Sequence, residues 1–313
     1  MTGANLPFTS AQPRRPMTGP MRHPFATVVG LVILLLAACG ADRPLRTEKS
    51  APALWIAEKG DLRAHIFGTI HVLPAGVAWE TPALRKATEG SDRLILEATG
   101  LDDEAASQKL FIAAGRSPGL PPVADRVPAD LRPTLDGLIS RGGMSAPVLD
   151  GYESWAAALL LSTATQGDLK LSGAQGVEPA LTEDFKAAGK PIDGLETIAS
   201  QFALFDRMPE DVQRRMLVAT LRDSTGAKAQ FDRMLDAWLH GDMRRIGDEF
   251  VDKVAPEPAL KQALLYDRNR AWADRIATLK GRPFIAVGAA HLAGRDNVID
   301  LLKAQGFKVK RVE

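Results

Sequence analysis

The sequence predicts an α/β (α+β) fold, in which a central mixed sheet is built from the N- and C-terminal segments and a large, mainly helical insertion lies between them. Short apolar runs bounded by turn residues gather near both ends of the chain, and helical patterns fill its middle. Strand–helix–strand units at each end favour one sheet that both ends share. The chain has 313 residues, and the part after residue 38 is long enough for one large domain or two small ones.

The N-terminal part of the expected sheet is a hairpin followed by a helix and a buried strand. The apolar runs at 52–57 and 62–70 flank the turn sequence Glu58-Lys-Gly-Asp61, which predicts two paired strands. A Pro-Ala-Gly loop precedes a helical pattern over 80–89. The short apolar run at 93–97 then predicts a buried strand.

The rest of the chain is predicted mainly helical until it closes on a second strand–helix–strand unit. Helix-period apolar positions, with Pro or Gly at the boundaries, indicate the helices. The expected elements are, in order, helices over 102–165 (interrupted at 117–122 and 145–147) and 177–188, a strand over 190–196, a helix from 197, four helical segments between 209 and 279, a strand over 283–288, a helix over 295–305 and a strand over 307–312.

Residues 1–38 have the pattern of an export signal. Basic residues precede an uncharged run over 25–38, which is too short and wrongly flanked for a stable membrane span. The run ends in Leu-Ala-Ala-Cys39, and Cys39 is the only cysteine of the chain. We therefore expect a mature lipoprotein whose acylated first residue is Cys39, with a tether over 39–52 and the folded domain over 53–313.

This interpretation places the protein in the cell envelope, lipid-anchored on the periplasmic side of the inner or the outer membrane. An ordinary signal peptide with an incidental cysteine is the alternative. The start codon stays open between Met1, Met17 and Met21.

The composition excludes some classes of partner and of metal site. The formal net charge is +1, which gives no basic footprint for nucleic acid. Because the one cysteine is assigned to lipid, a metal would have to bind histidine and carboxylate side chains. Outside the export signal the histidines are His65, His71, His240 and His291.

A short motif occurs twice in the sequence, and the predicted chemistry rests on it. Ile-Phe-Gly68-Thr-Ile-His71 matches Ala-Val-Gly288-Ala-Ala-His291, and each time an apolar strand runs into Gly-x-x-His. Both histidines therefore fall just beyond the carboxyl end of a strand, where open α/β sheets bind ligands. A histidine after a strand is often only a hydrogen-bonded loop residue. Two copies in matched contexts, among five histidines, favour a shared site.

Glu97 adds a carboxylate at a third strand end. It follows the apolar run Arg93-Leu-Ile-Leu, so we expect it to be partly buried, and burial of an unpaired charge is costly. A metal ion or an arginine would offset that cost. Two imidazoles and a carboxylate form the ligand set of several hydrolytic zinc sites, and manganese or cobalt suit it equally well. The alternative for Glu97 is a salt bridge to a helix arginine.

At these residues the chain resembles the TraB/PrgY/GumN family, which is marked by paired Gly-x-x-His motifs and an acidic residue at a strand end. The resemblance extends over about 53–313. The segments that carry it further are Lys190-Pro-Ile-Asp-Gly-Leu-Glu196-Thr with Gln201, Asp267-Arg268-Asn269-Arg270, and the closing run from Val287 to Gly294.

The resemblance implies a metal-dependent hydrolase. The Tiki relatives are proteases that use manganese or cobalt, and the wider superfamily contains erythromycin-esterase-like enzymes and haem-binding lipoproteins. It implies His71, Glu97 and His291 as the metal site, with Arg268 and Asn269 as catalytic helpers and a peptide or protein as substrate. Glu196, Gln201 and Glu178 match family positions to which we assign no role from the sequence.

The expected mechanism is hydrolysis at a divalent manganese, cobalt or zinc ion. His71 and His291 would bind the ion, and Glu97 would be a third ligand or the general base. Arg268 could stabilise an oxyanion, and Asn269 could orient water or substrate. The alternatives are a haem- or ligand-binding lipoprotein with His71 or His291 as axial ligand, and a regulatory factor. His65 is a weaker candidate near the site, and His240 is expected to cap a helix.

Overall fold

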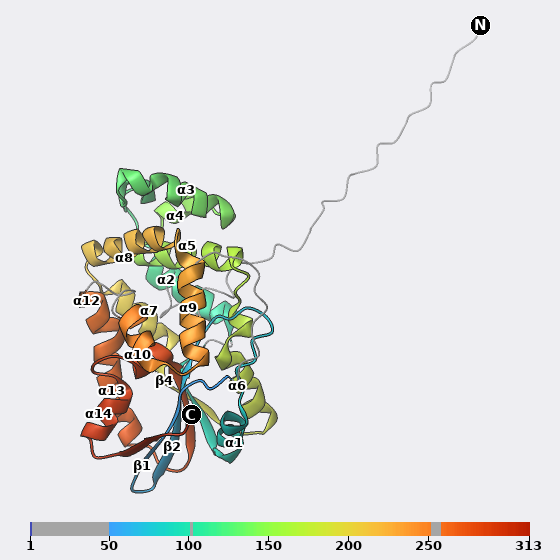
Figure 1. The fold of residues 1–313 in the computed structure, drawn as a ribbon. Helices are drawn as coiled ribbons and strands as arrows, with labels where there is room; N and C mark the ends of the chain where they lie inside the picture. The colour runs from blue at the N-terminus through green and yellow to red at the C-terminus, as the bar shows by residue number, and fades with distance from the viewer. Residues whose placement is uncertain (2–49, 101–102, 252–257) are drawn as a thin grey trace.

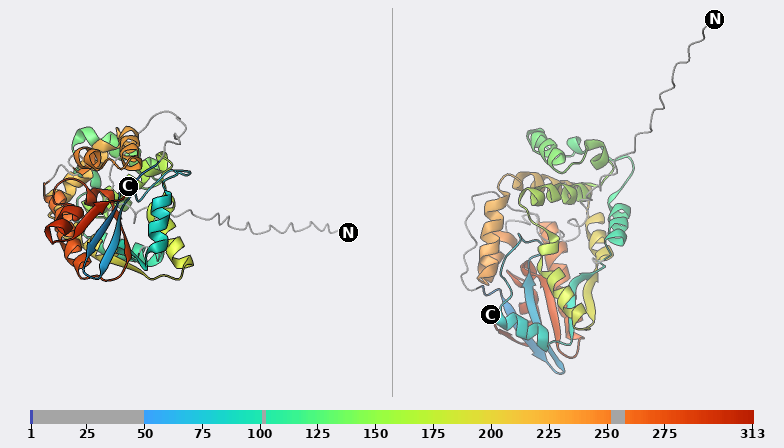
Figure 2. Two further views of the ribbon diagram at one scale, coloured as in Figure 1. Left: turned by 60° about the horizontal axis from the view of Figure 1, so that its bottom comes forward. Right: turned by 90° about the vertical axis from the view of Figure 1, so that its right-hand side faces the viewer.

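The computed structural model describes Met1 and residues 50–100, 103–251 and 258–313. The predicted export signal, Cys39 and most of the expected tether lie outside the described residues. A six-stranded sheet with the strand order β4-β3-β5-β2-β1-β6 forms the base of the molecule. Helices cover both faces of this sheet, and a lobe of further helices stands at one end of it (Figures 1 and 2). The predicted mixed sheet is confirmed.

The sheet is antiparallel toward one edge and parallel over the rest. Strands β1 (Leu54–Lys59) and β2 (Leu62–Thr69) form the predicted hairpin, in which Gly60 adopts a φ of +54°. Strand β5 (Pro283–Gly288) lies between β2 and β3 (Arg93–Thr99) and is parallel to both. The carboxyl ends of these three strands therefore meet at one edge of the sheet.

Two further strands complete the sheet. Strand β6 (Lys308–Arg311) pairs antiparallel with β1 and so joins the C-terminus to the N-terminal hairpin. Strand β4 (Ile192–Thr197) pairs parallel with β3 at the other edge. Because β4 comes from the middle of the chain, the helical insertion contributes one strand of its own to the sheet that the two ends build.

The helices follow the predicted order, with shorter pieces at several boundaries. Their bounds are α1 (Pro82–Gly90), α2 (Glu104–Gly115), α3 (Arg132–Arg141), α4 (Ala146–Asp150), α5 (Ser154–Asp168), α6 (Val177–Ala187), α7 (Ile198–Asp206), α8 (Glu210–Asp223), α9 (Ala227–Leu239), α10 (Met243–Ile246), α12 (Pro258–Lys261), α13 (Asp267–Ala277) and α14 (Val298–Ala304). Among the described residues, no helix combines the length and apolarity that crossing a membrane requires.

Alternate residues of the central strands supply two apolar cores. Phe67 and Phe284 point to the face covered by α1, α6 and α9, where they pack with Trp238. Their strand neighbours Ile66 and Ile285 point to the opposite face and pack against α13 and α14. This alternation is the expected result of the two-residue period of a strand with helices on both sides.

A third core lies inside the helical lobe. Trp155 of α5 stacks on Phe205 of α7 at 5.5 Å between ring centroids, and Phe111 of α2 meets both Trp155 and Phe202 edge-on. These aromatic side chains are almost fully buried, so they serve packing. The lobe stands over the end of the sheet at which the predicted site residues lie (Figure 1).

Candidate functional site

The structure brings both Gly-x-x-His histidines to the same oxygen of Glu97. His71 follows β2, His291 lies in the short turn Ala289–Leu292 after β5, and Glu97 is on β3. The distance from Nε2 of His71 to Oε2 of Glu97 is 3.9 Å, and from Nε2 of His291 to that oxygen it is 4.0 Å. Three adjacent parallel strands thus place two imidazoles and a carboxylate at their carboxyl ends.

Hydrogen bonds at Nδ1 fix the orientation of both imidazoles. Nδ1 of His71 lies 2.6 Å from Oε1 of Glu178, and Nδ1 of His291 lies 2.6 Å from Oδ1 of Asn269. The amide of Asn269 donates from Nδ2 to the carbonyl of Asp296, which can only accept, so its oxygen faces His291. Nδ1 of His291 is therefore the donor, and in its neutral form Nε2 presents a lone pair toward the site.

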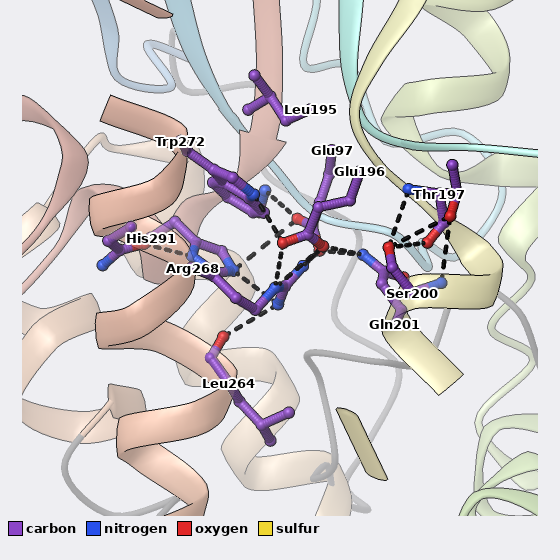
Figure 3. A network of polar contacts seen from close by, with 12 residues as sticks. Glu97, Leu195, Glu196, Thr197, Ser200, Gln201, Leu264, Arg268, Trp272 and His291 are labelled. Carbon is purple, nitrogen blue, oxygen red and sulfur yellow. Dashed lines mark hydrogen bonds and ion pairs between the residues drawn. The ribbon is translucent and has the colours of Figure 1, made fainter. Parts of the chain in front are cut away.

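The second oxygen of Glu97 is committed to Arg268 and Gln201. Oε1 accepts from Nη2 of Arg268 at 2.6 Å and from Nε2 of Gln201 at 3.1 Å (Figure 3). Oε2, in contrast, accepts from the backbone N–H of Gly288 at 3.1 Å and faces the two histidines. The alternative foreseen for Glu97, a salt bridge to a helix arginine, is therefore present on one oxygen, while the other remains directed at the imidazoles.

Arg268 is held by groups on several sides of its guanidinium. It donates from Nε and Nη2 to the carboxylate of Glu196 and from Nη1 to the carbonyl of Leu264. Its guanidinium lies 4.6 Å from the ring centroid of Trp272, whose indole N–H donates to Glu196 (Figure 3). Nη1 also lies 3.3 Å from Nε2 of His291. Arg268 thus reaches both Glu97 and His291 from a fixed position.

The surroundings move the pKa values of the central groups in different directions. Burial would lower the pKa of His71, but the charge of Glu178 and its hydrogen bond raise it to about 9. Burial and the charge of Arg268 lower the pKa of His291 to about 3. Burial would raise the pKa of Glu97, but the charge of Arg268 above all lowers it to about 2. At neutral pH the site therefore contains an imidazolium, a neutral imidazole and a carboxylate.

Solvent reaches this cluster at His71 and Glu178 and also at Glu196, whose side chains are 12%, 13% and 15% exposed. The side chains of Glu97, Arg268 and His291 are 7%, 3% and 0% exposed. Asn269 is also buried, and its amide oxygen and nitrogen are hydrogen-bonded to His291 and to the carbonyl of Asp296, respectively. We therefore assign Asn269 the orientation of His291, in place of the contact with water or substrate that the sequence suggests.

The other two histidines in the described part of the chain lie elsewhere. Nδ1 of His65 is 3.5 Å from Oγ of Ser91, at the end of α1. His240 caps the C-terminus of α9, and its Nδ1 lies 2.7 Å from the carbonyl of Asp236. Sequence reasoning assigned no role to Glu178, although its position two residues after Gly176, at a helix start, was a signal that could have found it.

The glycines of the two Gly-x-x-His motifs, Gly68 and Gly288, have different structural roles. A Cβ on Gly68 would lie 3.2 Å from both Cα and Cβ of Ala289, so Gly68 allows β2 to pack closely against the turn after β5. A Cβ on Gly288 would instead lie 3.2 Å from Nε2 of His71 and 3.4 Å from Oε2 of Glu97. Gly288 therefore keeps open the space that the imidazoles and the carboxylate share.

The side chains of His71, His291 and Glu97 are of the kind that bind a divalent cation, although their spacing is wider than that of a formed metal site. Among the described residues, no three His, Cys, Asp or Glu side chains stand at the spacing of a formed metal site. Ligand atoms about 2.1 Å from a tetrahedral ion would be about 3.4 Å apart, which the measured 3.9 and 4.0 Å approach closely. Binding would also require Nη1 of Arg268 to release Nε2 of His291.

The charge of the cluster supports the same fit. With both imidazoles neutral, the carboxylates of Glu97, Glu178 and Glu196 outnumber the guanidinium of Arg268 by two charges. A divalent cation would balance this excess. Each imidazole also has an acceptor on its other nitrogen, as metal-binding histidines almost always have.

Replacing Gly288 by alanine is expected to block the site while the fold is retained. The backbone of Gly288 has φ −51° and ψ 134°, which alanine adopts without strain, and the added methyl would occupy the space beside His71 and Glu97. We expect binding of divalent metal, measured by calorimetry, to fall by about 10-fold or more. Gly90→Ala is the control, because a Cβ at Gly90 would meet no atom within 4 Å and should leave metal binding unchanged.

Comparisons with known proteins place the chain in a family. The model of the TraB/PrgY/gumN family matches residues 53–311. The chain is 25% identical over 253 residues to "Uncharacterized protein YbaP" of Shigella flexneri and of Escherichia coli (strain K12), which covers 80% of this chain and 92% of each relative. No solved structure gave a significant match. A match over nearly the whole described domain shows that the chain belongs to the TraB/PrgY/gumN family.

Proposed function

We propose that the protein is a metal-dependent hydrolase, and that a peptide or protein is its substrate. The observation that carries the proposal is the convergence of two oriented imidazole Nε2 atoms on one carboxylate oxygen, at 3.9 and 4.0 Å. His71, His291 and Glu97 would hold the ion. A bound manganese, cobalt or zinc ion would supply Lewis acidity, which polarises a carbonyl group and makes water nucleophilic at neutral pH.

Glu97 is better suited to bind a cation than to act as the general base. Because Arg268 holds the pKa of Glu97 at about 2, its carboxylate is a weak proton acceptor at neutral pH. The negative charge on Oε2, to which the Gly288 N–H alone donates among the described residues, remains available to a cation. Of the two roles that the sequence left open for Glu97, we therefore assign that of ligand.

Arg268 supplies the positive charge for the transition state. Attack on a carbonyl places a negative charge on oxygen, and fixed donors stabilise that charge without reorganising. Nη1 of Arg268 is the donor that lies against Nε2 of His291, so it borders the reacting groups. The salt bridge from Nη2 to Glu196 keeps the guanidinium there when the contact with His291 is released.

Haem binding through His291 is disfavoured by its surroundings. An axial ligand must present its ring nitrogen to the flat face of the macrocycle. His291 is 0% exposed, its ring centroid lies 4.2 Å from that of Trp272, and Nε2 is in contact with Arg268. The hydrolase proposal accounts for these contacts, because they orient a small-ion ligand.

The direct test is metal content followed by catalysis. Elemental analysis of the purified full chain in detergent is expected to show one divalent ion per chain. Cleavage of a peptide library should require that ion and stop with a chelator. A Soret band after reconstitution with haem, together with no metal-dependent cleavage, would favour the ligand-binding alternative and contradict the proposal.

We also propose that Cys39 anchors the protein to the cell envelope on its periplasmic side. Support comes from the uncharged run over 25–38 that ends in Leu-Ala-Ala-Cys39. Replacing Cys39 by alanine is expected to abolish incorporation of labelled palmitate and to move the protein out of the membrane fraction. Label that persists in the Cys39→Ala protein would contradict lipidation at this residue.

A further inference from the structure

Glu178 makes a contact within the site that the proposed mechanism does not use. Its Oε1 accepts from Oγ1 of Thr69 and lies 2.6 Å from Nδ1 of His71, across 107 residues of sequence. The Glu178 side chain is only 13% exposed. A carboxylate that is largely buried and bonded twice through one oxygen has a defined direction. It therefore fixes the imidazole that it touches.

The backbone around Glu178 is hydrogen-bonded to the loop that carries His71. The N–H and carbonyl groups of Leu73 and Ser172 bond reciprocally at 3.3 and 3.2 Å, and the N–H of Val177 donates to the carbonyl of Ile70 at 3.2 Å. Between them, Gly176 approaches the carbonyl of His71 so closely that a Cβ would collide with it. The start of α6 is thus locked onto residues 70–73.

We propose that Glu178 is a positioning residue, which holds the His71 ring so that Nε2 faces Oε2 of Glu97. Without an acceptor at Nδ1, the ring could rotate about χ2 or bond water, and Nε2 would lose its fixed direction. That Nε2 binds a metal rests on the proposed function. The positioning itself rests only on the contacts of Glu178 with Thr69 and His71.

Glu178 also makes the two histidines chemically unequal. The partner of His71 is a carboxylate, whereas the partner of His291 is the neutral amide of Asn269. A carboxylate makes an imidazole a stronger donor of its lone pair than an amide does. His71 is therefore the stronger of the two candidate ligands, and it is also the more exposed one.

The test compares Glu178→Gln and Glu178→Ala, with Glu183→Gln on the exposed side of the same helix as control. Protein labelled with ¹⁵N at histidine should show a slowly exchanging Hδ1 signal from His71, identified by its absence in His71→Ala. Glu178→Gln should keep this signal, because the amide oxygen still accepts, and Glu178→Ala should lose it. The Hδ1 signal of His291, bonded to Asn269, should persist in both variants.

Metal titration by calorimetry, with Zn²⁺, Co²⁺ or Mn²⁺ as probe, gives the second measurement. Affinity should fall by about 10–100-fold in Glu178→Ala, fall less in Glu178→Gln, and stay unchanged in Glu183→Gln. An unchanged His71 Hδ1 signal in Glu178→Ala would overturn the inference. If the unmodified protein binds none of the three ions, the proposed metal-dependent function fails, and the NMR result alone decides the role of Glu178.

Discussion

Replacing His71 by alanine is expected to remove metal binding and turnover together while the fold is retained. The side chain is at the accessible edge of the site, and its Nε2 is one of the two imidazole nitrogens directed at Glu97. Loss of a residue that only hydrogen-bonds to a metal ligand can lower metal affinity by about 100-fold. Loss of the ligand itself should lower it by at least that factor. His291→Ala should have the same effect on metal binding. Metal content, kcat/KM and the circular dichroism spectrum of each variant check this expectation.

His65→Ala and His240→Ala are the matched controls for the histidine variants. His65 contacts Ser91, and His240 caps α9, so neither replacement touches the site. Both control proteins should keep the metal content and kcat/KM of the unmodified protein. Full metal stoichiometry and turnover in both His71→Ala and His291→Ala would show that the assigned ligands are wrong.

Replacing Arg268 by alanine is expected to cause the largest loss of stability at the site. The change leaves the buried carboxylate of Glu97 and the partly exposed one of Glu196 without their cation, and breaking a buried ion pair on one side costs about 3–5 kcal/mol. For a domain of this size the melting temperature should fall by on the order of 10 °C. Arg270→Ala on the same helix is the control, because its exposed pair with Asp267 contributes about 0–1 kcal/mol.

The loss of unfolding free energy in the Arg268→Ala protein should depend on pH. Arg268 lowers the pKa of Glu97 to about 2, from its ordinary value of 4.5. A lowered carboxylate pKa contributes stability above the unfolded-state value, and this contribution is lost as the pH falls toward 2. Without Arg268 the pKa of Glu97 rises, so urea unfolding should show a larger difference between the two proteins at pH 7 than at pH 3. A difference that is constant over this range would contradict the assigned pairing.

Local sequence patterns predicted the strands and the meeting of the histidines. The turn Glu58–Asp61 gave the β1–β2 hairpin, and apolar runs gave β3, β5 and β6 within a few residues. The repeated Gly-x-x-His motif placed both imidazoles beyond strand ends, and the structure brings both to Glu97. These features could be predicted because turn chemistry and a two-residue period act over short stretches of chain.

The partners of the site residues could not be predicted in the same way. That Glu196 binds Arg268, and that Glu178 bonds to His71, depends on side chains 72 and 107 residues apart in sequence. Position along the chain does not show which carboxylate reaches which cation, since strand order and helix packing decide it. The position of β4 at the sheet edge also depends on such long-range packing.

The strand order has a consequence for how the protein matures. Strand β5 is among the last segments to be synthesised, yet it lies between β2 and β3 and is the link between the two halves of the sheet. Until it arrives, β2 and β3 each have an unsatisfied edge that can pair with other chains. Nascent or C-terminally truncated chains should therefore be prone to aggregate, and His71, Glu97 and His291 can come together only after β5 has joined the sheet.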